Sequence, residues 1–353
     1  MNHVVCRESR GGIGIHAVIL AAGRGSRMSP LTDEVPKPLI PTAGLPIIER
    51  LISDLKTAGI HSFTIGVGWR GELIEEHLSQ LPDSDKIEVT TVIDYELGPL
   101  KTIVSALEIS QPERFLFCPA DYVVDPTIVS EIISVHNKQS SNQLVTLGVD
   151  MTADSGAFLH LSEDGHVIGF DRTTNDTRKT GRSVMSSVAE GIFLEHMQRA
   201  LAKGHTTVSS ALNQLIGEGY HVVSVPVSGY WFDIDDFTDL LAANQHLLQN
   251  LKLSPDDSLF VPSGDTIHVD NRDEISPGIT LGLGSQITGP TLVLAGTKLG
   301  PRCRVGPNVS LSRNTVLQEG CRIDNSILFG NALVSKSSKV HNAIVHGQAI
   351  FKR

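Results

Sequence analysis

Apolar residues recur at every sixth position through the carboxyl-terminal part of the chain. The unbroken series consists of Val269, Ile275, Leu281, Ile287, Val293, Leu299, Val305, Leu311, Leu317, Ile323 and Phe329. Because only 40% of the residues are hydrophobic, chance does not produce such a series. The residues two positions earlier are mostly small, namely Ser285, Thr291, Thr297, Cys303, Val309, Thr315 and Cys321. This period predicts a parallel β-helix over residues 254–353, in which three six-residue sides form one coil and each apolar residue points to the axis.

The period also fixes which residues stack on one another. Successive coils lie at the strand spacing of about 4.8 Å, so Cys303 and Cys321, 18 residues apart, should be neighbours. We expect reduced thiols with Cα atoms within about 7 Å of each other. At the end of the series the apolar phase shifts to Leu328, Val334 and Val340, which predicts an irregular last coil. Exposed strands on a flat face favour pairing, so we predict a homo-oligomer formed through this region.

Length and charge narrow the remaining possibilities. A chain of 353 residues is long enough for two domains. Its basic and acidic residues give 29 − 39 = −10, which argues against a nucleic-acid partner but allows a local cationic pocket. The four cysteines lack metal-ligand spacing, so no zinc site is expected. Residues 1–14 lack a signal-peptide core and no later run could span a membrane, so we predict a cytoplasmic protein with a short amino-terminal extension.

Strand and helix patterns alternate through residues 15–253. Strands are expected at residues 15–20, 63–67, 87–93, 115–118 and 144–149, and helices at residues 46–58, 72–78, 101–109 and 126–135. A hairpin at residues 158–170 precedes a strand at 188–193, helices at 195–203 and 207–216, a strand at 222–227 and a helix that ends near residue 250. This alternation predicts an α/β domain with a mostly parallel sheet between helices.

The first strand leads into a glycine-containing loop that suggests an anion site. Gly23 and Gly25 flank Arg24, and Arg27 follows two residues later. Glycines let backbone N–H groups approach phosphate oxygens, while an arginine fork or a lysine neutralises the charge. Lys37, between two prolines, is a second candidate cation. The loop is neither a P-loop nor a dinucleotide fingerprint, because the residues that those motifs require do not follow the glycines.

The longer string around this loop is more specific than the glycines alone. Residues 20–28 read LAAGRGSRM, residues 30–32 read PLT and residues 36–38 read PKP. This ordered string resembles the signature of the sugar-phosphate nucleotidylyltransferases, also called NDP-sugar pyrophosphorylases. The resemblance implies a Rossmann-like nucleotidyltransferase domain, a left-handed β-helix after it, and the conversion of a nucleoside triphosphate and a sugar 1-phosphate to an NDP-sugar and pyrophosphate.

The resemblance also implies a nucleotide site. Arg27 would stabilise the departing pyrophosphate, and Lys37 would neutralise the phosphates as the nucleophile approaches. The residues implied to bind the nucleotide are Leu20, Ala21, Ala22, Gly23, Gly25, Ser26 and Gly98. Gly98 is followed by Pro99 and Leu100, where the family usually has Gly-Thr-Ala. The nucleobase and the sugar therefore stay open.

Two aspartates are implied to hold Mg²⁺. Asp121 follows the strand at residues 115–118, where open α/β sheets bind ligands, and Asp233 lies in a Trp-x-Asp element. Alone, either aspartate would be a turn or capping residue. Ala120 stands where the family usually has glycine. The acids at positions 235 and 236 follow at once, and at least one of them is expected to cap the next helix.

Three residues are candidates for the sugar phosphate. Glu190 and Gly191 lie on the strand at residues 188–193, on which the resemblance places substrate contacts. Arg172 begins a polar, basic stretch, residues 172–182, that could close over a phosphate. The alternatives are a solvent-facing glutamate at the strand edge and a solvated surface loop.

Other functions fit the sequence less well. The main alternative is a catalytically silent regulatory or scaffolding relative, which has little need of both metal-binding aspartates. A metal-dependent glycosyltransferase would need an Asp-x-Asp element after the relevant strand, which is missing here, and it would not explain Pro36-Lys37-Pro38. Some relatives carry an acetyltransferase in the β-helix, but roughly five coils without a long inserted loop favour a structural or oligomerising role.

Overall fold

The structure, a computed structural model, describes residues 14–138, 142–170, 179–252, 257–270, 273–275 and 278–352. Outside these ranges lie Arg172, residues 1–13 of the amino-terminal extension, and residues 253 and 254, where the domain boundary is predicted. The chain forms two compact units. The first contains residues up to 23, 53–120 and 124–231, and the second contains residues 24–52, 121–123 and 232–353. The second unit therefore joins the segment after the glycine loop to the carboxyl-terminal repeat.

The first unit is built on one mixed sheet. Among the described residues the strand order is β5-β4-β1-β6-β11-β8-β12-β10-β9. The bounds are β1 His16–Ala21, β4 Phe63–Val67, β5 Ile87–Thr91, β6 Arg114–Pro119, β8 Gln143–Asp150, β9 Ala157–Leu161, β10 His166–Gly169, β11 Lys179–Glu190 and β12 His221–Pro226. Strands β5, β4, β1 and β6 are mutually parallel, as expected. Strand β11 runs antiparallel to both β6 and β8, so the expectation of a mostly parallel sheet holds only for the first half of the domain.

The helices form close to where the sequence places them, and α3, α4, α5 and α7 contact strands of this sheet. Their bounds are α2 Ile47–Thr57, α3 Gly71–Ser79, α4 Pro99–Ser110, α5 Pro126–His136, α6 Phe193–Ala202 and α7 Val208–Gly217, with the short α1 at Leu31–Glu34. Two predicted boundaries are wrong. Phe193 begins helix α6 instead of ending a strand, and Lys179 and Arg182 belong to strand β11 instead of the polar loop.

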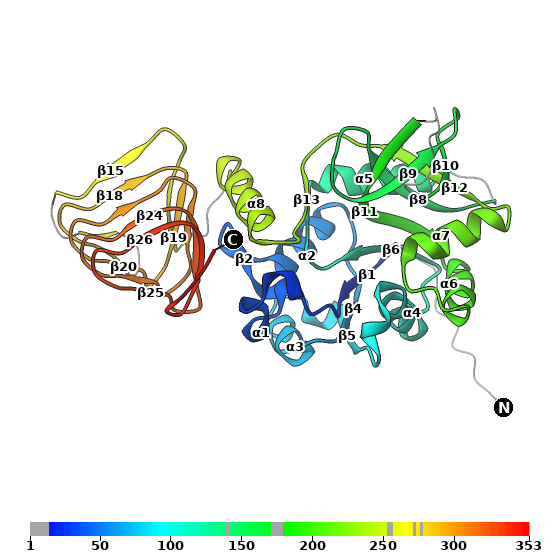
Figure 1. Ribbon diagram of the computed structural model, residues 1–353, viewed down its shortest axis with the longest axis horizontal. Helices are drawn as coiled ribbons and strands as arrows, with labels where there is room; N and C mark the ends of the chain where they lie inside the picture. Colours follow the sequence, from blue (N-terminus) through cyan, green and yellow to red (C-terminus); the bar gives the residue numbers. More distant parts are fainter. Residues whose placement is uncertain are drawn as a thin grey trace. The chain divides into compact units, whose positions relative to one another are not determined.

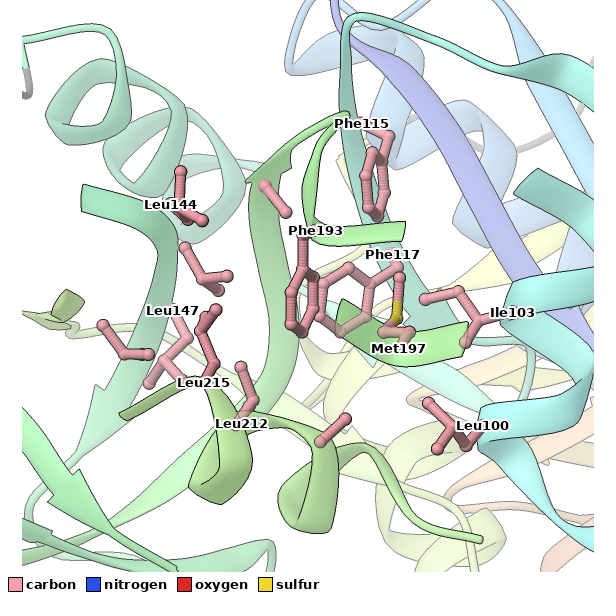
Figure 2. Packing of buried hydrophobic residues seen from close by; sticks show 14 of the residues in the cluster. Leu100, Ile103, Phe115, Phe117, Leu144, Leu147, Phe193, Met197, Leu212 and Leu215 are labelled. Atoms are coloured by element: carbon pink, nitrogen blue, oxygen red, sulfur yellow. The ribbon is translucent and has the colours of Figure 1, made fainter. Parts of the chain in front are cut away.

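Aromatic side chains fill the core of the first unit. The ring centroids of Phe117 and Phe193 lie 6.4 Å apart, and Phe115 is 5.9 Å from Phe117. Figure 2 shows Met197 beside these rings and Leu100 and the other labelled aliphatic residues around them. Burial of each such side chain contributes about 1.5–3 kcal/mol. This packing holds α4 and α6 in place against the strands that lead to the loops described below.

The carboxyl-terminal repeat forms a stack of short strands (Figure 1). The bounds are β14 Ser258–Val261, β15 Thr266–His268, β16 Asp273–Ile275, β17 Ile279–Leu281, β18 Gln286–Thr288, β19 Thr291–Leu294, β20 Lys298–Leu299, β21 Arg304–Val305, β22 Val309–Leu311, β23 Val316–Leu317, β24 Arg322–Phe329, β25 Leu333–Val334, β26 Lys339–His346 and β27 Ala349–Phe351. Parallel register pairs Ile287 with Val305 and Val305 with Ile323, an offset of 18 residues. The six-residue period therefore gives parallel coils whose apolar residues share one core.

The two ends of the stack depart from the regular coil. Strands β14, β15 and β16 pair antiparallel with β19, β18 and β17, so the expectation of parallel coils from Val269 onward is wrong for the first turn. The predicted phase shift is confirmed, because Leu328 pairs with Leu311 at an offset of 17 residues and lies in the core. The residue lost from this coil lies near Asn325, whose φ of 39° makes a tight corner.

The stacked cysteines match the expectation. Arg304, which follows Cys303, pairs in parallel register with Arg322, which follows Cys321, so the two cysteines lie on adjacent coils. Both are buried and neither forms a disulfide. Burial raises the pKa of the Cys303 thiol to about 11. These thiols are core residues of the stack.

Within the described part of the chain, none of the helices combines the length and the apolar character that crossing a membrane requires.

Candidate functional site

The glycine loop begins where strand β1 ends. Ala21 and Ala22 are buried at 3% exposure, so only their backbone faces the loop, whereas Gly23 is exposed. Gly25 has a φ of 67°, and a Cβ added there would lie 3.2 Å from Cγ2 of Thr32 and 3.3 Å from Cβ of Lys37. The Thr32 hydroxyl also donates to the Gly25 carbonyl at 3.0 Å. Glycine is therefore required at position 25 for the loop to pass Lys37 closely.

Lys37 and Asp121 form a partly buried ion pair. The lysine side chain is 7% exposed, and its Nζ lies 2.5 Å from Oδ2 of Asp121, which is 25% exposed. Lys37 begins a single turn of 3₁₀ helix, Lys37–Leu39, whose entry is fixed by the preceding proline. The structure thus brings together a predicted cation and a predicted metal ligand that lie 84 residues apart.

A short strand pair brings the second predicted metal ligand to the first. Strand β7, Tyr122–Val124, pairs with β13, Trp231–Asp233. The Ile234 N–H donates to the Asp121 carbonyl at 3.0 Å. Burial raises the pKa of Asp233 to about 7, the charges of Asp121 and Asp235 add to this, and Lys37 and Arg27 oppose it. The site therefore holds more negative charge than its cations neutralise.

The remaining acids have separate roles. Asp235 Oδ2 lies 2.5 Å from Nη1 of Arg27, in an ion pair whose side chains are 38% and 66% exposed. The Asp236 carboxylate accepts from the backbone N–H groups of Thr238 and Asp239 and caps helix α8, Phe237–Gln249, as predicted. Reasoning from the sequence missed the pairing of Asp235 with Arg27, because that contact depends on the fold.

Gly98 lies at the start of α4, after the loop that follows β5. Its φ is 103°, and a Cβ added there would lie 2.7 Å from the Thr206 carbonyl oxygen. Pro99 occupies the first helical position, where a missing N–H costs nothing, and Leu100 is fully buried in the core. The departure from the family pattern is thus accommodated by helix α4, and Leu100 does not add bulk at the surface of the site.

The loop after β4 contacts the backbone at Ala22, and Tyr95 from the loop after β5 lies against it. A Cβ added to Gly68 would lie 2.6 Å from the Tyr95 ring and 2.7 Å from the Ala22 carbonyl oxygen. The Trp69 N–H donates to that same carbonyl at 3.0 Å. Tyr95 is a neighbour of the predicted nucleotide loop that reasoning from the sequence missed.

Glu190 and Gly191 lie at the opposite end of the strands from the glycine loop. Because β11 is antiparallel to β6, Glu190 pairs with Arg114 at the start of β6, whereas the glycine loop lies beyond the end of the parallel strands. Glu190 Oε1 accepts from Nε of Arg114 at 2.9 Å and lies 3.2 Å from Nε2 of His136. A Cβ on Gly191 would lie 2.6 Å from the Pro112 carbonyl oxygen. The structure does not bring these two candidate sugar ligands to the glycine loop, and it gives each a structural role.

The fold and the charged cluster together define a class of protein. A parallel αβ core with a glycine loop after β1, two cations and adjacent aspartates suits the binding and transfer of phosphate groups. Comparison with family models identifies that class further, because the nucleotidyl transferase model matches residues 16–250. The chain belongs to the nucleotidyl transferase family. A second model, the GMPPB C-terminal domain, matches residues 287–351.

Individual relatives align with most of this chain. The bifunctional protein GlmU of Methanococcus aeolicus is 26% identical over 348 residues, which cover 95% of this chain and 76% of that protein. The catalytic subunit beta of mannose-1-phosphate guanylyltransferase from Drosophila pseudoobscura is 25% identical over 78% of this chain and 73% of that protein. Glucose-1-phosphate thymidylyltransferase of Streptomyces griseus is 23% identical over 93% and 91%.

Proposed function

We propose that this chain transfers a nucleotidyl group from a nucleoside triphosphate to a sugar 1-phosphate, as the names of its relatives state for those proteins. A phosphate oxygen of the sugar 1-phosphate forms a bond to the α-phosphorus, the bond from that phosphorus to the bridging oxygen breaks, and pyrophosphate leaves with its electron pair. Such a reaction depends on positioning and charge neutralisation and needs no side-chain nucleophile. The observation that supports it most is the Lys37–Asp121 pair beside the partly buried Asp233.

The cations of the second unit supply charge neutralisation. Arg27 is 66% exposed and needs only to exchange Asp235 for a phosphate oxygen, so we assign it to the departing pyrophosphate. Lys37 is held by Asp121 and by the closely packed Gly25, so it offers a fixed charge to the phosphates that react. The exposed backbone at Gly23 and Ser26 contributes N–H groups to the triphosphate.

The aspartates fit a divalent cation. In the described residues no three His, Cys, Asp or Glu side chains form a metal cluster, so any ion held here takes further oxygens from phosphates or water. The raised pKa of Asp233 shows negative charge without sufficient compensation, which is the condition a cation relieves. Asp121 and Asp233 are the ligands we propose, with Mg²⁺ as the metal. When bound, Mg²⁺ neutralises phosphate charge.

Four finer features are proposals as well. We assign a left-handed sense to the coil stack, a homo-oligomer formed through it, a cytoplasmic location, and a domain boundary near residues 253 and 254. Static light scattering of the full chain would determine the mass in solution. Arg172 lies outside the described residues and stays a proposed contact of the sugar phosphate, for which an Arg172→Ala variant should raise the KM of that substrate alone.

Pyrophosphate release tests the assignment. The full chain is mixed with Mg²⁺, each of the common nucleoside triphosphates and a panel of sugar 1-phosphates, and pyrophosphate is measured enzymatically. We expect turnover with at least one pair, and a loss of about a thousandfold in Arg27→Ala and in Asp121→Ala. Arg313→Ala is the matched control, because Arg313 forms a similarly exposed ion pair with Asp257 in the coil stack. Near-normal rates in both site variants would overturn the proposal.

A further inference from the structure

One outer face of the coil stack is buried. In β19, Val293 points to the core, so the adjacent Leu292 points outward, yet Leu292 is 0% exposed. Parallel register continues from Leu292 to Ser310, from Ser310 to Ile327 and from Ile327 to Ile344. All four residues, which we call the outer ladder, are at most 1% exposed. Outward residues of a coil are this well buried only where another element covers them.

The covering elements are helix α8 and a short hairpin. Helix α8 contacts β24 and β26, and the hairpin of β2, Pro41–Thr42, and β3, Leu45–Pro46, contacts β24 and α8. Gly44, at the tip of the hairpin, has a φ of 86°, and a Cβ added there would lie 2.8 Å from Cδ2 of Leu292. The backbone of the hairpin therefore rests directly on the outer ladder.

A single polar group interrupts this apolar contact. Ser310 is the polar member of the outer ladder, and its hydroxyl donates to Oδ1 of Asn244 in α8 at 2.7 Å. The same Oδ1 accepts the N–H of Ala43, at the tip of the hairpin, at 2.9 Å. Asn244 is 0% exposed. Among the described residues Nδ2 of Asn244 is buried without a partner, so the pairing of this side chain rests on the two bonds to Oδ1. Buried polar groups are costly unless they are paired, so loss of these two bonds is unfavourable and the junction favours one alignment of helix, hairpin and stack over neighbouring ones.

The hairpin is also constrained at its strained turn. Ala43 has a φ of 42°, which an L-residue adopts only when its surroundings hold it. Nη2 of Arg50 donates to the carbonyls of Thr42, at 2.9 Å, and Ala43, at 3.3 Å. The turn conformation is therefore fixed by α2 on one side and by Asn244 on the other.

Both ends of the charged cluster attach to this junction. Lys37 precedes Ala43 by six residues, and helix α8, which carries Asn244, begins four residues after Asp233. We infer that Asn244 is a positioning residue, through which the coil stack sets the place of Lys37 opposite Asp121. The carboxyl-terminal repeat is then part of the catalytic unit and not only a handle for assembly. This inference rests on the proposed function of Lys37.

Three variants of the full chain test the inference. Asn244→Ala removes the shared acceptor, and Asn244→Asp keeps an acceptor oxygen in its place. Ile327→Val trims the same outer ladder without touching the polar junction. We expect Asn244→Ala to lower kcat about tenfold with little change in the KM of the triphosphate, because displacement of a catalytic group acts on the transition state. Asn244→Asp should restore kcat to within about threefold but lower the Tm, because it buries a carboxylate without a cation, and Ile327→Val should lower the Tm alone.

A second readout separates this inference from the proposed function. Lys37 is buried and ion-paired, so acetic anhydride should acetylate it slowly in the wild type, as followed by mass spectrometry. Asn244→Ala should speed its acetylation several-fold at a temperature well below the Tm, even if no substrate pair is turned over. If both kcat and the acetylation rate of Lys37 are unchanged in Asn244→Ala, the junction is only structural and the inference is wrong.

Discussion

Two charged clusters of the molecule contain the same kinds of side chain but differ in the balance of their charges. In the second unit, Lys37 and Asp121 form an ion pair beside Asp233, whose pKa is raised to about 7. In the first unit, Glu190 accepts from Arg114 and from His136, whose pKa burial lowers. The charges of the Glu190 cluster are balanced, because one carboxylate faces one cation and a neutral imidazole. Imbalance of charge, and not the mere presence of ionisable residues, is what distinguishes the proposed site from the Glu190 cluster.

The largest expected effect comes from removing the cation of each cluster in turn. Lys37→Met should lower kcat/KM about a thousandfold with little loss of stability, because the freed Asp121 can face substrate cations or solvent. Arg114→Met should leave kcat within about threefold and lower the free energy of unfolding by a few kcal/mol, since it leaves Glu190 partly buried without its cation. Steady-state kinetics and urea denaturation of both variants measure this contrast. Equal loss of activity in the two variants would contradict it.

The next prediction concerns the uncompensated carboxylate. The pKa of Asp233 is about 7 in the folded protein, above its ordinary value of 3.8. Because the unfolded chain loses this proton at lower pH than the native protein does, the native protein loses stability as the pH rises from 3.8 to about 7. Without divalent metal, Asp233→Asn should therefore be more stable than the wild type at pH 8, on the order of a few kcal/mol, and no more stable at pH 4. Thermal unfolding across this pH range measures the difference.

The exposed Asp164 supplies the control for that experiment. Its pKa is lowered by a hydrogen bond from Ser162, so Asp164→Asn should give no stabilisation at pH 8. Added Mg²⁺ should raise the Tm of the wild type more than that of Asp233→Asn, because the ion binds the charged carboxylate. A stability gain in Asp233→Asn that is the same at both pH values would contradict the assignment.

The smallest expected effect concerns His136, the neutral member of the Glu190 cluster. His136 is buried with a lowered pKa, so the native protein resists its protonation and loses stability as the pH falls below the ordinary value of about 6.5. His136→Gln, which can still pair with Glu190 and Thr146, should flatten this acid-side loss by about 1 kcal/mol. Urea denaturation at pH 7 and pH 5.5 measures the change in the free energy of unfolding between the two pH values. An equal change in the wild type and the variant would contradict the assignment of a neutral His136 to the Glu190 cluster.

The sequence predicts local patterns well and directions of pairing poorly. The six-residue period and its shift to Leu328 were correct because each depends on neighbouring residues along one strand. The first turn of the stack and strand β11 were misjudged because apolar spacing does not encode whether a strand runs parallel or antiparallel. The resemblance that placed Glu190 near the substrate gave no sign of its pairing with Arg114.

The candidate site follows the same division. Lys37 could be named from the long motif at residues 20–38, and Asp121 and Asp233 from two separate elements that resemble those of the family; the structure places the three residues in one cluster. The partnership of Arg27 with Asp235 and the junction at Asn244 could not be named, because each joins segments distant in sequence through a single tertiary contact. Only the folded chain reveals such contacts.

The coil that is one residue short has a practical consequence. Since side chains alternate across a strand, deleting a residue within a flat side would exchange inner and outer faces for everything that follows. Here the deletion falls at the Asn325 corner, where a left-handed backbone absorbs it and Leu328 still reaches the core. Corners of this kind are therefore the places where the prism can be lengthened or shortened by single residues, and where a loop carrying a new binding function could be grafted without refitting the coils.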